Sequence, residues 1–265
     1  MPGARGIRHR ARLRDSRTPP AMVLWITARA YASVMDEVRP AVADDDVERV
    51  RREVYRGFVT DGRPPSRAAL AVTTGLALEQ VDEAMAVLAT TRHVVLDDAG
   101  RVVMAHPFAA IDLHFSVKGR RTLWWGGCAW DSFAIPNLVP EERQVLVATT
   151  CPACGRAHAW VVTSEGPPEG DQVAHFLVPA AHVWDDVVHT CGHQRIFCEE
   201  ACVEEWLTRT GNQRGSVFDL ATLWRLAAHW YDGRLDSPYV RREPAQAKAY
   251  FAEVGLRGAF WGLPD

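Results

Sequence analysis

Cysteine is confined to one stretch of this 265-residue chain, and this confinement restricts its fold and chemistry more than any other feature. All six cysteines lie between positions 128 and 202, and the first 127 residues contain none. The sequence has no apolar run of membrane-spanning length and no secretory signal, so we expect a cytoplasmic protein whose thiols stay reduced. In a reducing compartment, clustered cysteines indicate metal binding or thiolate chemistry rather than disulfides.

Four of the cysteines form two closely spaced pairs that are typical of a structural zinc site. Cys151 and Cys154 make a C-x-x-C motif followed by glycine, and Cys198 and Cys202 make a C-x-x-x-C pair at the start of a predicted helix. A knuckle and a helix-start pair together supply the four sulfurs of many small zinc sites. The alternative is that these are four reduced thiols packed as small hydrophobic side chains.

The two remaining cysteines, Cys128 and Cys191, each lie beside titratable groups. Asp131 follows Cys128 by three residues and shares a face with it if the segment CAWDSF begins a helix. Cys191 lies between His189 and His193. A cysteine hydrolase would use one thiol and a histidine base, whereas two thiols with a carboxylate suit a soft metal better.

The chain up to about residue 108 has the pattern of a winged helix-turn-helix domain. An acidic start predicts a helix from Asp44, Ser66 caps a short helix that ends at Gly75, and a third helix covers residues 77–94. The segment HVVLDDAGRVVMAHPF then predicts two strands joined by a turn. We therefore expect residues 23–108 to form this domain.

The charge of this predicted domain does not favour nucleic-acid binding. The second helix of the helix-turn-helix pair would be the recognition helix. It carries Glu79, Asp82 and Glu83 and has no lysine or arginine before Arg92. Contacts to phosphate need cations, so a winged helix used for packing is the better interpretation. The net charge of −3 for the whole chain gives no electrostatic case for nucleic acid or membrane binding either.

From residue 109 the composition changes to short strand-like segments followed by helices. This pattern predicts an α+β protein in which the N-terminal winged helix precedes a mixed α/β domain, residues 109–232, with a small and mostly antiparallel sheet. Residues 233–265 are expected to form a C-terminal helical extension. Residues 1–22 are rich in arginine, and we interpret them as a disordered basic tail or as the product of an upstream start codon.

Several of these segments resemble the organomercurial (alkylmercury) lyase family. The resemblance rests on GGCAWDSFAIPNLV, ATTCPACGRAH, HTCGHQRIFCEEACVEEW and the winged-helix pattern upstream, and it covers roughly residues 45–230. It implies a carbon–mercury bond lyase with a part in mercury resistance. Two family cysteines and an aspartate that cleave the bond fall on Cys128, Cys191 and Asp131, and a family cysteine considered structural falls on Cys151.

The resemblance also implies a reaction, its partners and its cofactor needs. The two thiolates bind mercury, the carboxylate delivers a thiol proton to the departing carbon, and a hydrocarbon leaves while Hg²⁺ stays on Cys128 and Cys191. Cellular thiols or a mercuric reductase then take the ion. No cofactor is required, and Cys154, Cys198 and Cys202 depart from the family's catalytic set, which fits the possible structural zinc site with Cys151.

A second interpretation from another class stays open on the sequence alone. Six thiols and a winged helix also suit a non-catalytic metal-binding sensor or carrier for mercury, copper or zinc. A gel shift with promoter DNA would separate a DNA-binding sensor from an enzyme.

Overall fold

The computed structural model describes residues 42–265, which form one compact unit. The predictions for residues 1–22 and for the first part of the winged-helix domain lie outside the described residues. Helices and antiparallel strands are both plentiful, and this confirms the predicted α+β class. None of the helices in residues 42–265 is both long enough and apolar enough to cross a membrane.

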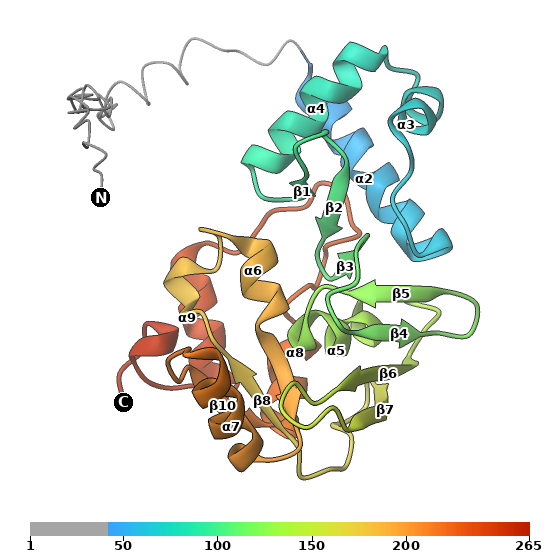
Figure 1. The fold of residues 1–265 in the computed structure, drawn as a ribbon. Helices are drawn as coiled ribbons and strands as arrows, with labels where there is room; N and C mark the ends of the chain where they lie inside the picture. The colour runs from blue at the N-terminus through green and yellow to red at the C-terminus, as the bar shows by residue number, and fades with distance from the viewer. Residues whose placement is uncertain (1–41) are drawn as a thin grey trace, which may run out of the picture. The chain divides into compact units, whose positions relative to one another are not determined.

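Three helices and a β-hairpin open the described chain in the predicted order (Figure 1). The helices are α2 (Asp44–Asp61), α3 (Arg67–Thr74) and α4 (Leu78–Thr90), and the hairpin strands are β1 (Val95–Leu96) and β2 (Val102–Ala105). Ser66 caps α3 by accepting a hydrogen bond from the Ala69 amide, and Gly75 ends the helix in the left-handed conformation that glycine tolerates. These elements agree with the predicted pattern, while the winged-helix identity itself stays a prediction.

The hairpin does not stand apart from the rest of the chain, because it continues into the main sheet. The strand order is β1-β2-β3-β5-β4-β6-β7, and all pairings are antiparallel. The further strands are β3 (Phe108–Ala109), β4 (Ser116–Lys118), β5 (Leu123–Gly126), β6 (Gln144–Thr150) and β7 (Ala157–Thr163). The sheet is therefore larger than predicted, because the hairpin strands extend it through β3.

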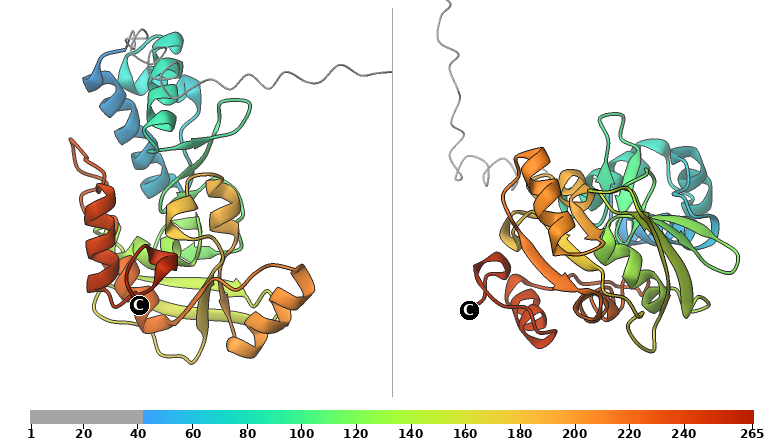
Figure 2. Two further views of the ribbon diagram at one scale, coloured as in Figure 1. Left: turned by 90° about the vertical axis from the view of Figure 1, so that its left-hand side faces the viewer. Right: turned by 60° about the horizontal axis from the view of Figure 1, so that its bottom comes forward.

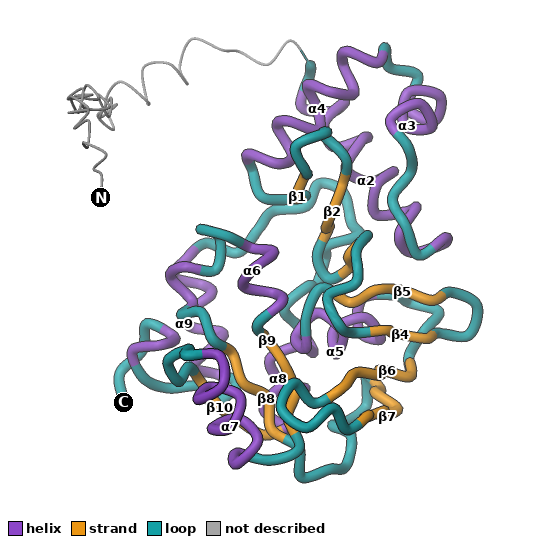
Figure 3. Tube along the Cα trace, in the orientation of Figure 1, coloured by secondary structure: helices purple, strands orange, loops and turns teal. Residues whose placement is uncertain are grey.

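A second, three-stranded antiparallel sheet follows in the order β10-β8-β9. Figure 2 shows the same ribbon from two further sides. Its strands are β8 (Val173–Phe176), β9 (Gln194–Phe197) and β10 (Ser216–Asp219). The surrounding helices are η1 (Ala180–His182), α6 (Val187–Gly192), α7 (Glu200–Thr210), α8 (Leu220–Ala228), α9 (Pro244–Glu253) and η2 (Ala259–Trp261), as Figure 3 shows. Helix α8 begins after Asp219, which caps it by accepting a hydrogen bond from the Thr222 amide.

Helix α5 (Ala129–Leu138) is enclosed by the other elements and carries the sequence on which the functional prediction rests. All of its residues except Asn137 are buried, including the polar Asp131 and Ser132. The helix contacts β5, β6, β7, β9 and α8. The indole of Trp130 fixes it to α8 by donating to the Leu226 carbonyl at 3.1 Å.

The predicted C-terminal extension forms helix α9 and the short η2, and both pack on this core. Phe251 of α9 stacks on Trp230 at 5.3 Å between ring centroids and meets the edge of Trp261 at 5.1 Å. Trp130 of α5 contacts both Trp230 and Phe251. The extension therefore packs against the core and completes an aromatic cluster with Trp130 of α5.

Candidate active site

Cys128 occupies the N-cap position of α5, where the backbone is still extended before the helix begins. Its Sγ accepts a hydrogen bond from the Asp131 amide at 3.3 Å, one of the amides that a helix start leaves without a backbone partner. The same turn of helix therefore presents the thiol and the carboxylate together. Both are almost fully buried, with 1% of each residue exposed.

Cys191 comes from α6, far along the sequence, and meets Cys128 across one small cavity. Asp186 caps α6 by accepting from the His189 amide at 2.9 Å, which starts the helix on which Cys191 lies. Cys128 and Cys191 both line this cavity, and each thiol shifts the pKa of the other. The fold thus brings the three predicted residues Cys128, Asp131 and Cys191 to the lining of one cavity.

The two thiols differ in their acidity. Burial raises the pKa of Cys128 well above its usual value, and the Cys191 sulfur and the Asp131 carboxylate raise it further. The hydrogen bond from Cys128 lowers the pKa of Cys191, and His106 adds to this lowering while burial opposes it. The pKa of Cys191 therefore lies below that of Cys128, so the pair loses its first proton from Cys191.

His106 is a site residue that the sequence did not reveal. Its Nε2 lies 3.5 Å from the Cys191 Sγ and 4.0 Å from the Asp131 Oδ2. Burial alone would lower the pKa of His106, but the Asp131 carboxylate and the Cys191 sulfur raise it above its usual value. The imidazole of His106 therefore faces both the Cys191 sulfur and the Asp131 carboxylate. His106 directly follows strand β2, and the sequence pattern of this segment indicates only a hairpin. No motif or residue spacing therefore identified it as a site residue.

The two carboxylate oxygens of Asp131 have different surroundings. Oδ1 accepts a short hydrogen bond from the Tyr231 hydroxyl, whereas Oδ2 is buried without a hydrogen-bond partner among the described residues. Burial raises the pKa of Tyr231 well above its usual value, so this phenol stays a donor. One oxygen is thus held in place and the other is left to exchange a proton.

Two glycines before Cys128 make room for the site itself rather than for a ligand. A Cβ on Gly127 would lie 2.2 Å from the Asp131 Oδ2, and a Cβ on Gly126 would lie 2.0 Å from the Ser132 Oγ. By contrast, a Cβ on Gly192, next to Cys191, would meet nothing within 4 Å. The neighbouring rings of His189 and His193 lie tilted to each other with centroids 4.1 Å apart, and they do not line the cavity.

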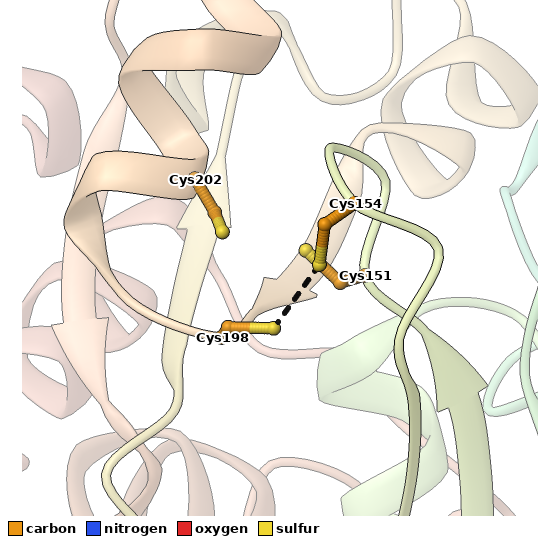
Figure 4. Close-up of side chains that lie close together, drawn as sticks. All are labelled: Cys151, Cys154, Cys198 and Cys202. Atoms are coloured by element: carbon orange, nitrogen blue, oxygen red, sulfur yellow. Dashed lines mark hydrogen bonds between the residues drawn. The ribbon is translucent and has the colours of Figure 1, made fainter.

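The other four cysteines gather at a separate place, as Figure 4 shows. The sulfurs of Cys151, Cys154, Cys198 and Cys202 all lie within 4.8 Å of one another, and those of Cys154 and Cys198 are 3.4 Å apart. Cys151 and Cys154 come from the turn between β6 and β7, while Cys198 follows β9 and Cys202 lies in the first turn of α7. The predicted pairs therefore converge, although 44 residues separate Cys154 from Cys198.

Comparison with known proteins gives a family match and a structural match. The family model described as alkylmercury lyase (MerB) matches residues 108–232. The crystal structure of the mercury-bound form of MerB2 is similar to this chain, with a TM-score of 0.53 and 15% sequence identity, over 74% of this chain and 93% of that chain. No curated protein matches the sequence significantly. The family match confirms the predicted resemblance, and the structural match extends the likeness of fold beyond it.

Proposed function

On the premise that residues 108–232 form an alkylmercury lyase domain, we propose that Cys128, Asp131 and Cys191 carry out the protonolytic cleavage of carbon–mercury bonds. The observation that carries this assignment is the meeting of two thiols and one carboxylate at a single buried cavity. Thiolates bind soft metals more strongly than oxygen or nitrogen ligands do. The carboxylate beside them supplies the means to move a proton to carbon.

The reaction begins at Cys191, whose pKa is lowered by its hydrogen bond from Cys128 and by His106. Its thiolate attacks the mercury of an organomercury–thiol complex and displaces the carrier thiolate. Cys128 passes its proton to the unpartnered Oδ2 of Asp131 and becomes the second sulfur ligand. Two sulfurs push electron density toward the mercury-bound carbon, which weakens its bond to the metal.

The proton on Asp131 then moves to the carbon as the carbon–mercury bond breaks. The bonding electron pair stays with carbon, the hydrocarbon leaves, and Hg²⁺ remains bound to Cys128 and Cys191. The Tyr231 hydrogen bond to Oδ1 holds the carboxylate in place while Oδ2 accepts and releases the proton. The chain supplies both nucleophiles and the proton, so the reaction needs no cofactor.

Release of Hg²⁺ calls for other thiols, because two sulfur ligands hold the ion firmly. Cellular thiols, or the thiols of a mercuric reductase, are the partners that this chemistry requires, and both need a reducing compartment such as the cytoplasm. The direct test is benzene formation from phenylmercury with excess thiol. Loss of turnover in Cys128→Ser and in Cys191→Ser is expected, and turnover that survives either change rejects the assignment.

A change at His106 should shift the pH dependence of the reaction. The His106 imidazole lowers the pKa of Cys191, so we expect His106→Gln to raise that pKa. The acidic limb of the kcat/KM profile reports the ionisation of the free enzyme, and we expect it to move to higher pH by about one unit. His182→Gln, which removes an exposed histidine, is the control. A profile that stays unchanged in His106→Gln would show that this imidazole does not act on the thiolate.

We also propose that the four-cysteine cluster holds a structural zinc ion, separate from the catalytic pair. In a regular tetrahedral site with zinc–sulfur bonds of about 2.3 Å, the sulfurs lie roughly 3.8 Å apart, which fits this cluster. Packing as small hydrophobic groups explains the cluster poorly, because only Cys151 is buried and Cys154 is exposed. The Nε2 of His158 lies 3.3 Å from the Cys198 Sγ, and Arg209 of α7 donates to the Pro152 and Ala153 carbonyls.

Metal analysis tests this proposal independently of lyase activity. The purified protein should contain one zinc per chain, and Cys154→Ser combined with Cys198→Ser should lose the ion and lower the melting temperature. Cobalt substitution of the intact site should give the strong sulfur-to-metal absorption of a four-thiolate centre. Cys128→Ser should keep its zinc, because that thiol belongs to the catalytic cavity. Metal-free protein whose melting temperature is unaffected by a chelator would overturn the proposal.

A further inference from the structure

Three arginines line the catalytic cavity together with the two thiols. Arg234, Arg241 and Arg242 come from the segment between α8 and α9. Each guanidinium lies over an aromatic ring of the same cavity: Arg234 over Tyr239 at 4.6 Å, Arg241 over Trp184 at 4.9 Å, and Arg242 over Trp230 at 5.7 Å. Stacking on aromatic rings fixes the planes of the guanidinium groups and leaves their edges to bind other groups. We call these three residues the arginine rim.

The positive charge of the arginine rim is not balanced within residues 42–265. None of the three arginines forms a salt bridge there. The hydrogen-bond acceptors of Arg241 and Arg242 are the Thr91 and His229 carbonyls. Asp131, the one carboxylate among the cavity-lining residues of this part of the chain, is already engaged with Tyr231. The cavity therefore combines several cations with little compensating negative charge.

A fourth arginine strengthens this imbalance. Arg92 also lies over the Trp184 ring, with its guanidinium 5.5 Å from the ring centroid. Burial lowers the pKa of Arg241, and the charges of Arg234 and Arg92 lower it further. Cations that repel one another inside a partly enclosed cavity cost free energy unless an anion enters. The Nε of Arg234 is also buried without a hydrogen-bond partner among the described residues.

We propose that the arginine rim binds a carboxylate carried by the substrate, so that the cavity selects anionic organomercury complexes. This inference rests on the proposed lyase function and names its substrate class. Guanidinium groups pair with carboxylates in a two-point geometry that also fixes orientation. The carboxylate comes either from the carrier thiol or from the organic group, and the chemistry of recognition is the same in both.

The arginine rim also fits the first chemical step. The Cys191 thiolate forms a bond to mercury while the bond from mercury to the carrier sulfur breaks, and the carrier leaves as a thiolate. That leaving group is itself an anion, and nearby guanidinium groups stabilise the charge that develops on it. A carboxylate anchored at the rim would hold the mercury close to the two thiols before this exchange.

The test compares kcat/KM for four substrates that differ in charge and in the position of the charge. Phenylmercury is presented with mercaptoacetate, with 2-mercaptoethanol or with cysteamine, and p-mercuribenzoate is presented with 2-mercaptoethanol. We expect about tenfold higher kcat/KM for the mercaptoacetate complex than for the neutral one, which corresponds to about 1.4 kcal/mol, and the lowest value for cysteamine. A preference for p-mercuribenzoate instead would place the carboxylate on the organic group.

Variants separate the arginine rim from general effects of charge. In the double variant Arg241→Gln, Arg242→Gln, the ratio of kcat/KM for the anionic substrate to that for the neutral one should fall to about one. Arg101 is an exposed arginine in the β1–β2 turn, and Arg101→Gln should keep the wild-type ratio. High salt should weaken the preference in the wild type. Equal rates for anionic and neutral substrates, or a preference unchanged in the double variant, would overturn the inference. Absence of turnover with all four substrates would instead reject the lyase function itself.

Discussion

Asp131→Asn is expected to lower kcat for phenylmercury cleavage by at least about a thousandfold, in the upper part of the range for general acid–base groups. Asparagine keeps the shape of the side chain and can still accept the Tyr231 hydrogen bond. It cannot take the Cys128 proton or deliver one to carbon. Because the two thiols remain, the variant should still capture phenylmercury in a one-to-one adduct detectable by mass spectrometry. The expected state is therefore a trapped substrate without benzene release.

The control for this result is Asp98→Asn, which changes an exposed carboxylate in the β1–β2 turn. It should turn over at the wild-type rate. Benzene release by Asp131→Asn within tenfold of the wild-type rate would contradict the assignment of the proton to this carboxylate. Loss of both turnover and adduct formation would mean that Asp131 acts on mercury capture rather than on protonation.

Gly127→Ala is expected to lower kcat/KM by at least about a hundredfold, because displacement of a catalytic group by about 1 Å costs that much. The added methyl group would lie 2.2 Å from the Asp131 Oδ2 and 2.8 Å from the Met104 Cε. Real Cβ contacts are longer than this, so the carboxylate has to turn away from Cys128 and His106. The overall fold should survive, since the side chain of Asp131 can move more easily than the backbone of α5.

Gly192→Ala is the matched control, because it adds the same methyl group beside Cys191, the other cysteine of the proposed catalytic pair. That methyl group would meet nothing within 4 Å and would lie in helix α6, where alanine is favoured over glycine. This variant should keep wild-type kcat/KM and melting temperature. Wild-type activity in Gly127→Ala would show that the position of Oδ2 is not critical to the reaction.

The sequence was sufficient to predict the two cysteine sets, because their local spacing reflects their local structure. Cys128 and Asp131 share one helical turn, and Cys198 and Cys202 fall at a strand end and a helix start, as their segments indicated. The meeting of Cys128 and Cys191 depended on the resemblance to alkylmercury lyases, since nothing local to either residue predicts it.

Residues that join the site through long-range packing could not be predicted in this way. His106 reaches Cys191 across 85 residues, and Tyr231 reaches Asp131 across 100 residues. Each lies in a segment whose pattern indicates only a hairpin or the end of a helix. The extent of the sheet was also missed, because strand β3 is two residues long and yet joins the hairpin to the remaining strands.

The most direct test of the proposed chemistry is a single turnover with phenylmercury in D₂O. We expect one benzene per chain, carrying one deuterium from the exchanged thiol, and one Hg²⁺ per chain held until excess thiol removes it. In Cys128→Ser and in Cys191→Ser, benzene formation should cease. Benzene formed at the wild-type rate in either variant, or phenylmercury that stays intact on the wild-type protein, would contradict the account.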